Sequence, residues 1–348
     1  QAPLKVVLAQ RDERGGDHRE GRGKEGGRRH RAQLHPKHAV ALLRQPHHVA
    51  ALAAQGDQDP RRLIDEYERT RDEVADFKNA GGDTLVDLQP LGGGRHAELL
   101  ERVSRETGVT VVAATGQHKP MFYPDGAWPM GESAGELAGL FVSEIREGMY
   151  AYHPSEPLSR RTSIRAGVIK VATGEEGLNE PCRLVFEAAA LAYGDTGAPV
   201  ITHTELGACG AEQAVFLIER GVAPERIVIG HMDRRADLEE NLRVARTGVF
   251  LAYDTIARHM YHSDDEEIAL IRGMVERGFG GRLLLGMDVT RDRMLAYGGE
   301  PGLAHLARRF AARLREQVGE RETEAMLRDN PGRALSFTVP GTGTATRE

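Results

Sequence analysis

The sequence predicts an α/β protein built as a (β/α)8 barrel, and three observations support this fold class. From about residue 59 onward, short apolar runs alternate with helix-like segments over most of the 348 residues. The runs are continuously apolar, as in parallel strands that are covered on both faces. The first strand is not followed by the glycine-rich phosphate fingerprint that would favour an open sheet.

The strand-like runs are rich in valine, isoleucine, leucine and alanine. Most of them end at a polar residue, which becomes important for the site. They cover residues 83–89, 109–115, 166–172, 198–204, 226–232, 248–254 and 282–288. A closed barrel needs an eighth strand, and we expect it at residues 4–10, LKVVLAQ, the N-terminal candidate.

Helix-like patterns connect most of these runs. Residues 180–197, 210–221, 263–278 and 301–318 are the clearest examples. We expect Ser263 to cap the third of these helices, because acidic residues fill its first turn and a glycine ends it. The glycine-rich LGGGRH at residues 91–96 lacks both nucleotide-binding spacings, so it is interpreted as a loop that leads into a helix.

The N-terminal part of the chain has a different composition. No aromatic residue precedes Tyr67, and residues 11–38 consist almost entirely of arginine, glycine, glutamate, histidine and aspartate. Such a segment has too little apolar surface to offset the entropy of ordering, so we expect it to be disordered or loosely attached. A basic arm for an acidic partner is the alternative. We therefore divide the chain into an atypical segment (1–58), a barrel (59–340) and a tail (341–348).

Bulk properties exclude several classes of partner. The net charge of -6 and the pI near 6.2 give no basic footprint for nucleic acid. The two cysteines, Cys182 and Cys209, have no metal or redox spacing. The sequence contains no apolar run of membrane-spanning length and nothing like a signal peptide. We expect a cytoplasmic protein that acts on a small molecule, with a homodimer as one compatible assembly.

Polar side chains interrupt or end four of the predicted strands: Lys170, His203, His231 and Asp288. Each also has a purely structural explanation, such as a hydrogen-bonded histidine at the barrel rim or an aspartate that caps a helix. In a barrel, however, all four meet at the C-terminal mouth, where this fold carries its chemistry. Together they favour a functional site over four coincidences. Asp233, two residues after His231, is expected to orient the ligands.

These residue types suit a divalent transition metal such as zinc. Two neutral imidazoles and a carboxylate are ordinary zinc ligands. A lysine ammonium is a poor ligand, but its carbamate, formed with carbon dioxide, can bridge two ions. Metal-assisted hydrolysis follows, in which Asp288 accepts a proton from the activated water and passes it to the leaving oxygen.

The order and spacing of these landmarks resemble the phosphotriesterase-related family of the amidohydrolase superfamily. The resemblance implies that Lys170 is a carboxylated bridging ligand, that His203 and His231 bind the second metal, and that Asp288 is both ligand and proton shuttle. It also implies two divalent ions per subunit, with zinc favoured and manganese or cobalt as options. The motifs are GVIKVATG (167–174), VITHTE (200–205), IGHMDR (229–234), GMDVTR (286–291) and DNPGRALSF (329–337).

One family feature is missing. The first strand of the family ends in a His-x-His pair that holds the first metal, and no His-x-His occurs in this sequence. The closest arrangement is HPKH at residues 35–38, which has the wrong spacing. Two explanations stay open: a shifted reading frame through residues 1–58, or a genuinely divergent segment. The first-metal ligands are therefore unassigned.

Within the family, residues 116–126 and 253–267 look closest to the hydrolases of phosphorylated sugar lactones. We therefore expect a lactonase, with Arg258, Tyr261 and Lys119 in the loops that contact the substrate and its phosphate. The alternatives are a phosphotriesterase or an acyl-homoserine lactone hydrolase, since loop shape decides the substrate. A third alternative is a catalytically impaired barrel that acts as a binding protein.

Overall fold

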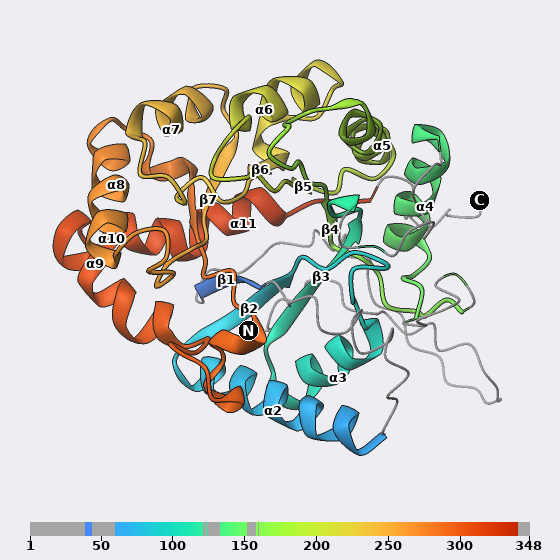
Figure 1. Ribbon diagram of the computed structural model, residues 1–348, viewed down its shortest axis with the longest axis horizontal. Coiled ribbons are helices and arrows are strands. Elements are labelled where there is room, and N and C mark those ends of the chain that lie inside the picture. Colours follow the sequence, from blue (N-terminus) through green and yellow to red (C-terminus); the bar gives the residue numbers. More distant parts are fainter. Residues whose placement is uncertain are drawn as a thin grey trace, which may run out of the picture.

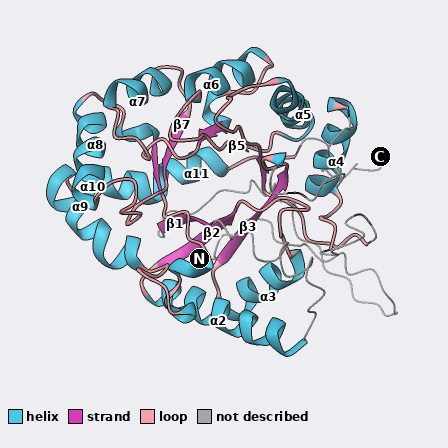
Figure 2. Cartoon of the chain, viewed as in Figure 1, coloured by secondary structure: helices cyan, strands magenta, loops and turns pink. Residues whose placement is uncertain are grey.

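The computed structural model describes residues 39–43, 60–120, 123, 133–151, 158 and 160–339, with the backbone alone for 39–43 and 60–66. Its strands form one parallel eight-stranded sheet in the order β1 to β8, and β8 returns to contact β1. Helices surround this ring of strands (Figures 1 and 2). The predicted (β/α)8 barrel is confirmed.

Each apolar run from 83–89 to 282–288 overlaps one strand, and six of these seven strands are shorter than their run. The other strand, Thr110–Gly116, has the same length as its run and is shifted by one residue. The strands are β1 (Ala39–Leu43), β2 (Gly82–Asp87), β3 (Thr110–Gly116), β4 (Val168–Lys170), β5 (Val200–Ile201), β6 (Ile227–Ile229), β7 (Phe250–Tyr253) and β8 (Leu283–Leu285).

The eighth strand is not where the sequence predicted it. Residues 39–43, AVALL, form β1, which pairs with β2 so that Leu43 lies opposite Asp87. The assignment to residues 4–10 is therefore wrong. A strand of a (β/α)8 barrel is followed along the chain by the helix that leads to the next strand, and residues 39–43 lie much closer in sequence to α2 (Pro60–Asn79) than residues 4–10 do. Residues 4–10, 11–38 and 341–348 lie outside the described residues.

The predicted helices are present with small changes of bounds. Ser263 caps α8 and forms a capping box with Glu266, as its sequence indicates. The helix predicted at 301–318 begins later, as a π-helical turn at Leu306–Phe310 that continues into α9. The other helices are α3 (Ala97–Thr107), α4 (Ala134–Arg146), α5 (Glu180–Thr196), α6 (Gly210–Glu219), α7 (Leu238–Ala245), α8 (Asp264–Glu276), α9 (Ala311–Val318), α10 (Glu320–Glu324) and α11 (Asn330–Leu335).

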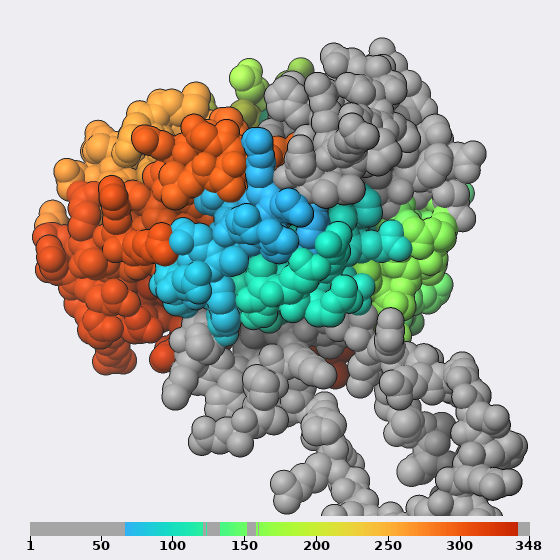
Figure 3. Space-filling view, turned by 90° about the horizontal axis from the view of Figure 1, so that it is seen from below, coloured from blue at the N-terminus to red at the C-terminus, as the bar shows by residue number. Residues whose placement is uncertain are grey.

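The apolar core has two parts, inside and outside the ring of strands. Val86, Val228 and Phe250 belong to the inner cluster, whereas the larger cluster packs the strands against the helices. On the outer surface α2 and α3 lie side by side (Figure 3), joined by a 2.8 Å hydrogen bond from Tyr67 to Glu106. Both faces of strands β2 to β8 are thus covered, which explains the continuous apolar runs.

One end of the barrel is closed by the C-terminal helix. Ala334 and Leu335 of α11 join the inner core cluster, and Asn330 donates a 2.7 Å hydrogen bond to the carbonyl of Leu283, the first residue of β8. This helix therefore covers the end where the strands begin. The C-terminal ends of the strands form the other mouth, which is left for the site. Among the described residues, no helix is long and apolar enough to cross a membrane.

Candidate active site

The structure places the four predicted strand-end residues at the same mouth. Lys170 ends β4, while His203, His231 and Asp288 lie just after β5, β6 and β8. All four are buried, with exposed fractions between 1% and 3%. The rings of His203 and His231 meet edge to face at 4.5 Å between centroids, and Lys170 Nζ donates a 3.1 Å hydrogen bond to the carbonyl of Thr202. The sheet order thus brings together residues that are far apart in sequence.

His231 is oriented by a carboxylate. Asp254, directly after β7, has its Oδ1 2.6 Å from Nδ1 of His231, and both side chains are buried. Burial and the neighbouring Asp288 raise the pKa of Asp254 to about 7, although Arg234 and Lys170 act in the opposite direction. A carboxylate on one imidazole nitrogen fixes the tautomer and leaves the other nitrogen to bind a ligand, as in many metal sites.

Backbone strain is concentrated at the same mouth. His231 and Asp288 have φ angles of 60° and 42°, in the left-handed region that non-glycine residues rarely adopt. Gly116 at the end of β3 has φ of 109°, and a Cβ there would lie 1.9 Å from the carbonyl oxygen of Lys170. A positive φ at a non-glycine residue such as His231 or Asp288 costs about 1–3 kcal/mol and occurs preferentially at functional sites, whereas glycine adopts it without strain.

Lys119 joins the mouth through a glutamate that the sequence did not single out. Glu205 Oε2 lies 2.9 Å from Nε2 of His203 and 2.6 Å from Nζ of Lys119. The ring of His118 lies 5.3 Å from that of His203. Lys119, predicted to contact the substrate, is therefore held beside a predicted metal ligand by a shared carboxylate.

Two arginines converge on Asp288. Arg234 and Arg258 donate hydrogen bonds of 3.1 and 3.0 Å to its Oδ2. The guanidinium of Arg234 also lies 5.0 Å from the centre of the Tyr261 ring. The predicted substrate residues Arg258 and Tyr261 thus lie at the mouth, together with Arg234, which was not among the predicted site residues.

Asp233 turns away from the residues it was expected to orient. Its Oδ2 accepts hydrogen bonds of 2.5 and 2.6 Å from the backbone NH and the hydroxyl of Thr255. Burial and the charge of Asp254 raise its pKa to about 7. Its carboxylate lies near His262 and Glu267 rather than in hydrogen-bond contact with His203 or Lys170 in the described part of the chain.

The described residues fit part of a binuclear centre. His203 and His231 supply imidazoles, Asp288 a carboxylate and Lys170 an amine, all buried at the strand ends. The strand that carries the first-metal ligands in the family is β1, and its sequence AVALL offers no ligating side chain. Residues 44–59, which follow it, lie outside the described part. The first-metal ligands therefore stay unassigned.

Two residues at the mouth were missed although the same strand-end signal marks them. Asp254 follows the last residue of β7, and Asp87 is the last residue of β2. Both predicted runs contain these aspartates near their C-terminal ends, just as the run at 282–288 ends in Asp288. A carboxylate near the end of an apolar run therefore marks these two positions as well.

Asp87 provides a pH-dependent prediction. Burial raises its pKa to about 6, although its Oδ1 accepts a 2.9 Å hydrogen bond from the NH of Gln89. The unfolded carboxyl ionises near pH 3.9, so between about pH 4 and 6 the folded state holds the extra proton and stability falls as pH rises. Asp87→Asn, which can keep that hydrogen bond, is expected to raise the free energy of unfolding by about 2 kcal/mol at pH 8 and by much less at pH 4.

Urea unfolding at both pH values measures this difference. The exposed Asp195→Asn is the control for a change of charge alone, and it should show no comparable dependence on pH. An Asp87→Asn effect of equal size at pH 4 and pH 8 would contradict a buried, reluctantly ionised carboxyl.

The comparisons with known proteins show the family of this chain. The sequence profile described as "Phosphotriesterase family" matches residues 47–335. The chain belongs to the phosphotriesterase family. The resemblance inferred from its motifs is therefore confirmed.

Its relatives have several names. The chain is 32% identical to the phosphotriesterase homology protein of Escherichia coli over 77% of this chain and 88% of that protein. It is 31% identical to a phospho-furanose lactonase of Mycoplasmopsis synoviae, covering 76% and 78% of the two chains. An aryldialkylphosphatase of Saccharolobus solfataricus is 29% identical over 65% of this chain and 69% of its own.

A solved structure supports the same assignment. The phosphotriesterase homology protein from Escherichia coli, complexed with phosphate in its active site, superposes with a TM-score of 0.75 at 30% identity. The match covers 87% of this chain and 100% of that one. Family members are hydrolases of esters, lactones and phosphotriesters and generally depend on a binuclear metal centre.

Proposed function

We propose that this family member is a lactonase that opens the cyclic ester of a phosphorylated sugar. The observation that carries the proposal is the arginine pair on Asp288, since Arg234 and Arg258 bring two guanidiniums to the mouth. Guanidinium groups bind phosphate through paired, charge-assisted hydrogen bonds. The name of the phospho-furanose lactonase and the phosphate in the Escherichia coli structure support the same class of substrate.

The two arginines differ in access. The side chain of Arg258 is 17% exposed, whereas that of Arg234 is 3% exposed. Arg258 is therefore the group that meets the phosphate, and Arg234 holds Asp288 in place. A phosphate at the mouth competes with the Asp288 carboxylate for Arg258, which frees one lone pair of Asp288 for proton transfer.

Asp288 then completes the hydrolysis. A divalent cation held by Lys170, His203 and His231 would lower the pKa of a water molecule and polarise the lactone carbonyl. Asp288 accepts a proton as the water oxygen attacks the carbonyl carbon. The ring C–O bond breaks, and Asp288 returns the proton to the leaving alkoxide oxygen. Asp254 keeps His231 in position throughout.

The test is Arg258→Ala. We expect kcat/KM for a phosphorylated sugar lactone to fall about 100-fold, because a charge-assisted contact contributes about 1.5–3 kcal/mol. The unphosphorylated lactone should lose much less, and most of the loss should appear in KM. Arg272 is exposed on α8, and Arg272→Ala is the matched control, which should change kcat/KM for neither lactone. Equal losses on the two lactones would contradict the assignment.

One observation favours a second candidate. Because β1 carries no ligating side chain, the barrel would bind a small molecule without hydrolysing it if no other residue completes the centre. Binding of the phosphorylated lactone to the metal-loaded protein with no turnover would support this candidate. Phosphotriester hydrolysis, the activity in the name of the aryldialkylphosphatase, is checked by comparing rates on the two substrate classes.

Four finer points stay predictions. They are the use of zinc rather than manganese or cobalt, the carboxylation of Lys170, a cytoplasmic location and a homodimeric assembly. The carbamate is consistent with the burial of Lys170 beside the two histidines, where an anionic ligand would balance the charge of a cation.

A further inference from the structure

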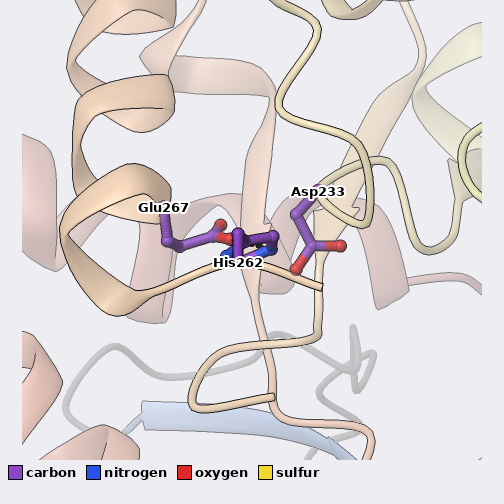
Figure 4. A group of neighbouring side chains, drawn as sticks. All are labelled: Asp233, His262 and Glu267. Atoms are coloured by element: carbon purple, nitrogen blue, oxygen red, sulfur yellow. Dashed lines mark ion pairs between the residues drawn. The ribbon is translucent and has the colours of Figure 1, made fainter. Parts of the chain in front are cut away.

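A second group of metal-ligating side chains lies beside the mouth but outside it. Asp233 follows β6, His262 lies in the loop before α8, and Glu267 is on α8 itself. Figure 4 shows the three side chains directed toward one another. One ligand atom from each lies within 4.8 Å of the other two, and their exposed fractions are 0%, 8% and 1%. The proposed reaction uses neither His262 nor Glu267.

The hydrogen bonding of His262 defines which nitrogen faces the cluster. Its Nδ1 lies 3.2 Å from the carbonyl oxygen of Ser263, which can only accept, so Nδ1 carries the proton. Although burial acts in the opposite direction, the carboxylate of Glu267 raises the pKa of His262 to about 9, so Nε2 also carries a proton at neutral pH unless a cation takes its place. Nε2 lies 3.0 Å from Oε2 of Glu267, but no hydrogen bond of good geometry joins them. Two electron-pair donors this close repel each other unless a proton or a cation lies between them.

The carboxylates present further oxygen atoms that lack a donor. Oδ1 of Asp233 and Oε1 of Glu267 are buried without a hydrogen-bond partner among the described residues. The hydroxyl of Tyr253, in β7, is likewise buried without a hydrogen-bond partner among the described residues. Burial and the charges of Glu267 and Asp233 raise the pKa of this phenol well above 10. A protonated His262 balances only one of the two buried carboxylates, whereas a divalent cation bound to the neutral imidazole would balance both.

We propose that Asp233, His262 and Glu267 bind one divalent metal ion of the Zn²⁺ class, at a site separate from the predicted metal ligands of the mouth. One imidazole and two carboxylates form an ordinary ligand set for such an ion. The carbonyl of Ser263 on Nδ1 orients the imidazole, as an outer partner does in known metal sites. This inference does not depend on the proposed lactonase activity.

Such an ion would connect three elements of the barrel. Its ligands come from the end of β6, the loop between β7 and α8, and the second turn of α8. That loop also carries Arg258 and Tyr261, so the ion would hold the proposed phosphate-binding residues in place. The role is one of positioning, because none of the three ligands contacts Asp288 in the described contacts.

The test measures how many zinc ions each protein chain retains. The full chain is loaded with excess Zn²⁺, freed of loosely held metal by gel filtration and analysed for zinc per chain. We expect Glu267→Gln and His262→Gln each to hold about one equivalent less than the original protein. Glu276→Gln makes the same chemical change on an exposed part of α8 and should lose none. His203→Asn should lower the count through the mouth alone, and combining it with Glu267→Gln should lower it further.

A measurement on the unaltered protein covers the case in which a variant fails to fold. Crystals grown with zinc should show anomalous scattering at the zinc edge about 2.0–2.1 Å from Nε2 of His262. Unchanged zinc content in folded Glu267→Gln and His262→Gln, or no anomalous peak at this position, would overturn the proposal and leave a protonated His262 as the bridging charge. Absence of lactonase activity would not affect either result, so the two proposals fail separately.

Discussion

Asp288→Asn is expected to lower kcat/KM on a phosphorylated lactone by about 1,000-fold, within the range contributed by a positioned general base. Asparagine matches the aspartate in shape and tolerates its φ of 42°, so the fold should persist. It cannot accept and return the proton, and it no longer neutralises Arg234 and Arg258. The loss should therefore lie mainly in kcat, whereas the phosphate contact keeps KM within a few-fold.

Initial rates as a function of lactone concentration measure both parameters. Asp265→Asn, at a largely exposed position in the first turn of α8, is the control for loss of a carboxylate near the barrel. A variant that keeps more than a tenth of the original kcat would exclude Asp288 as the proton acceptor. It would direct attention to Asp254 and Glu205, the carboxylates that contact His231 and His203.

Glu144→Ala is expected to cause the largest loss of stability, about 3–5 kcal/mol, because it leaves a buried arginine without its counter-charge. Arg95 and Glu144 are both fully buried and joined by two hydrogen bonds, of 2.5 and 2.8 Å. The hydroxyl of Thr115 and the backbone NH of Tyr150 also donate to Glu144. This network ties α4 to the end of β3, next to Gly116 and the carbonyl of Lys170.

Chemical unfolding of three variants distinguishes charge from packing. Arg95→Met combined with Glu144→Leu should be more stable than Glu144→Ala alone, because a buried pair replaced by apolar groups leaves no isolated charge. Glu98→Ala, which breaks an exposed bidentate pair with Arg160, should cost far less. A Glu144→Ala loss as small as that of Glu98→Ala would show that the Arg95 guanidinium finds another partner.

Part of the site was predictable because a strand end is a local feature. Continuous apolar runs identified the positions of β2 to β8, and polar residues near the ends of four of these runs predicted Lys170, His203, His231 and Asp288 at one mouth. Ser263 was likewise predictable, since a helix cap depends on residues three positions apart. The position of β1 was not, because AVALL at residues 39–43 has no distinctive flanking signals in a segment rich in charged residues.

By itself the sequence determined the fold class, the order of the strands and the residue types available at the mouth. These follow from local periodicity and composition, which act within a few residues. Only the tertiary structure decided the partners: Asp254 for His231, Arg234 and Arg258 for Asp288, and Glu267 with Asp233 for His262. Most of these pairs form between residues 23 to 54 positions apart, because closure of the barrel brings neighbouring strand ends together. Which charged side chains form pairs depends on their length and burial at these strand ends, and no local sequence pattern encodes either property.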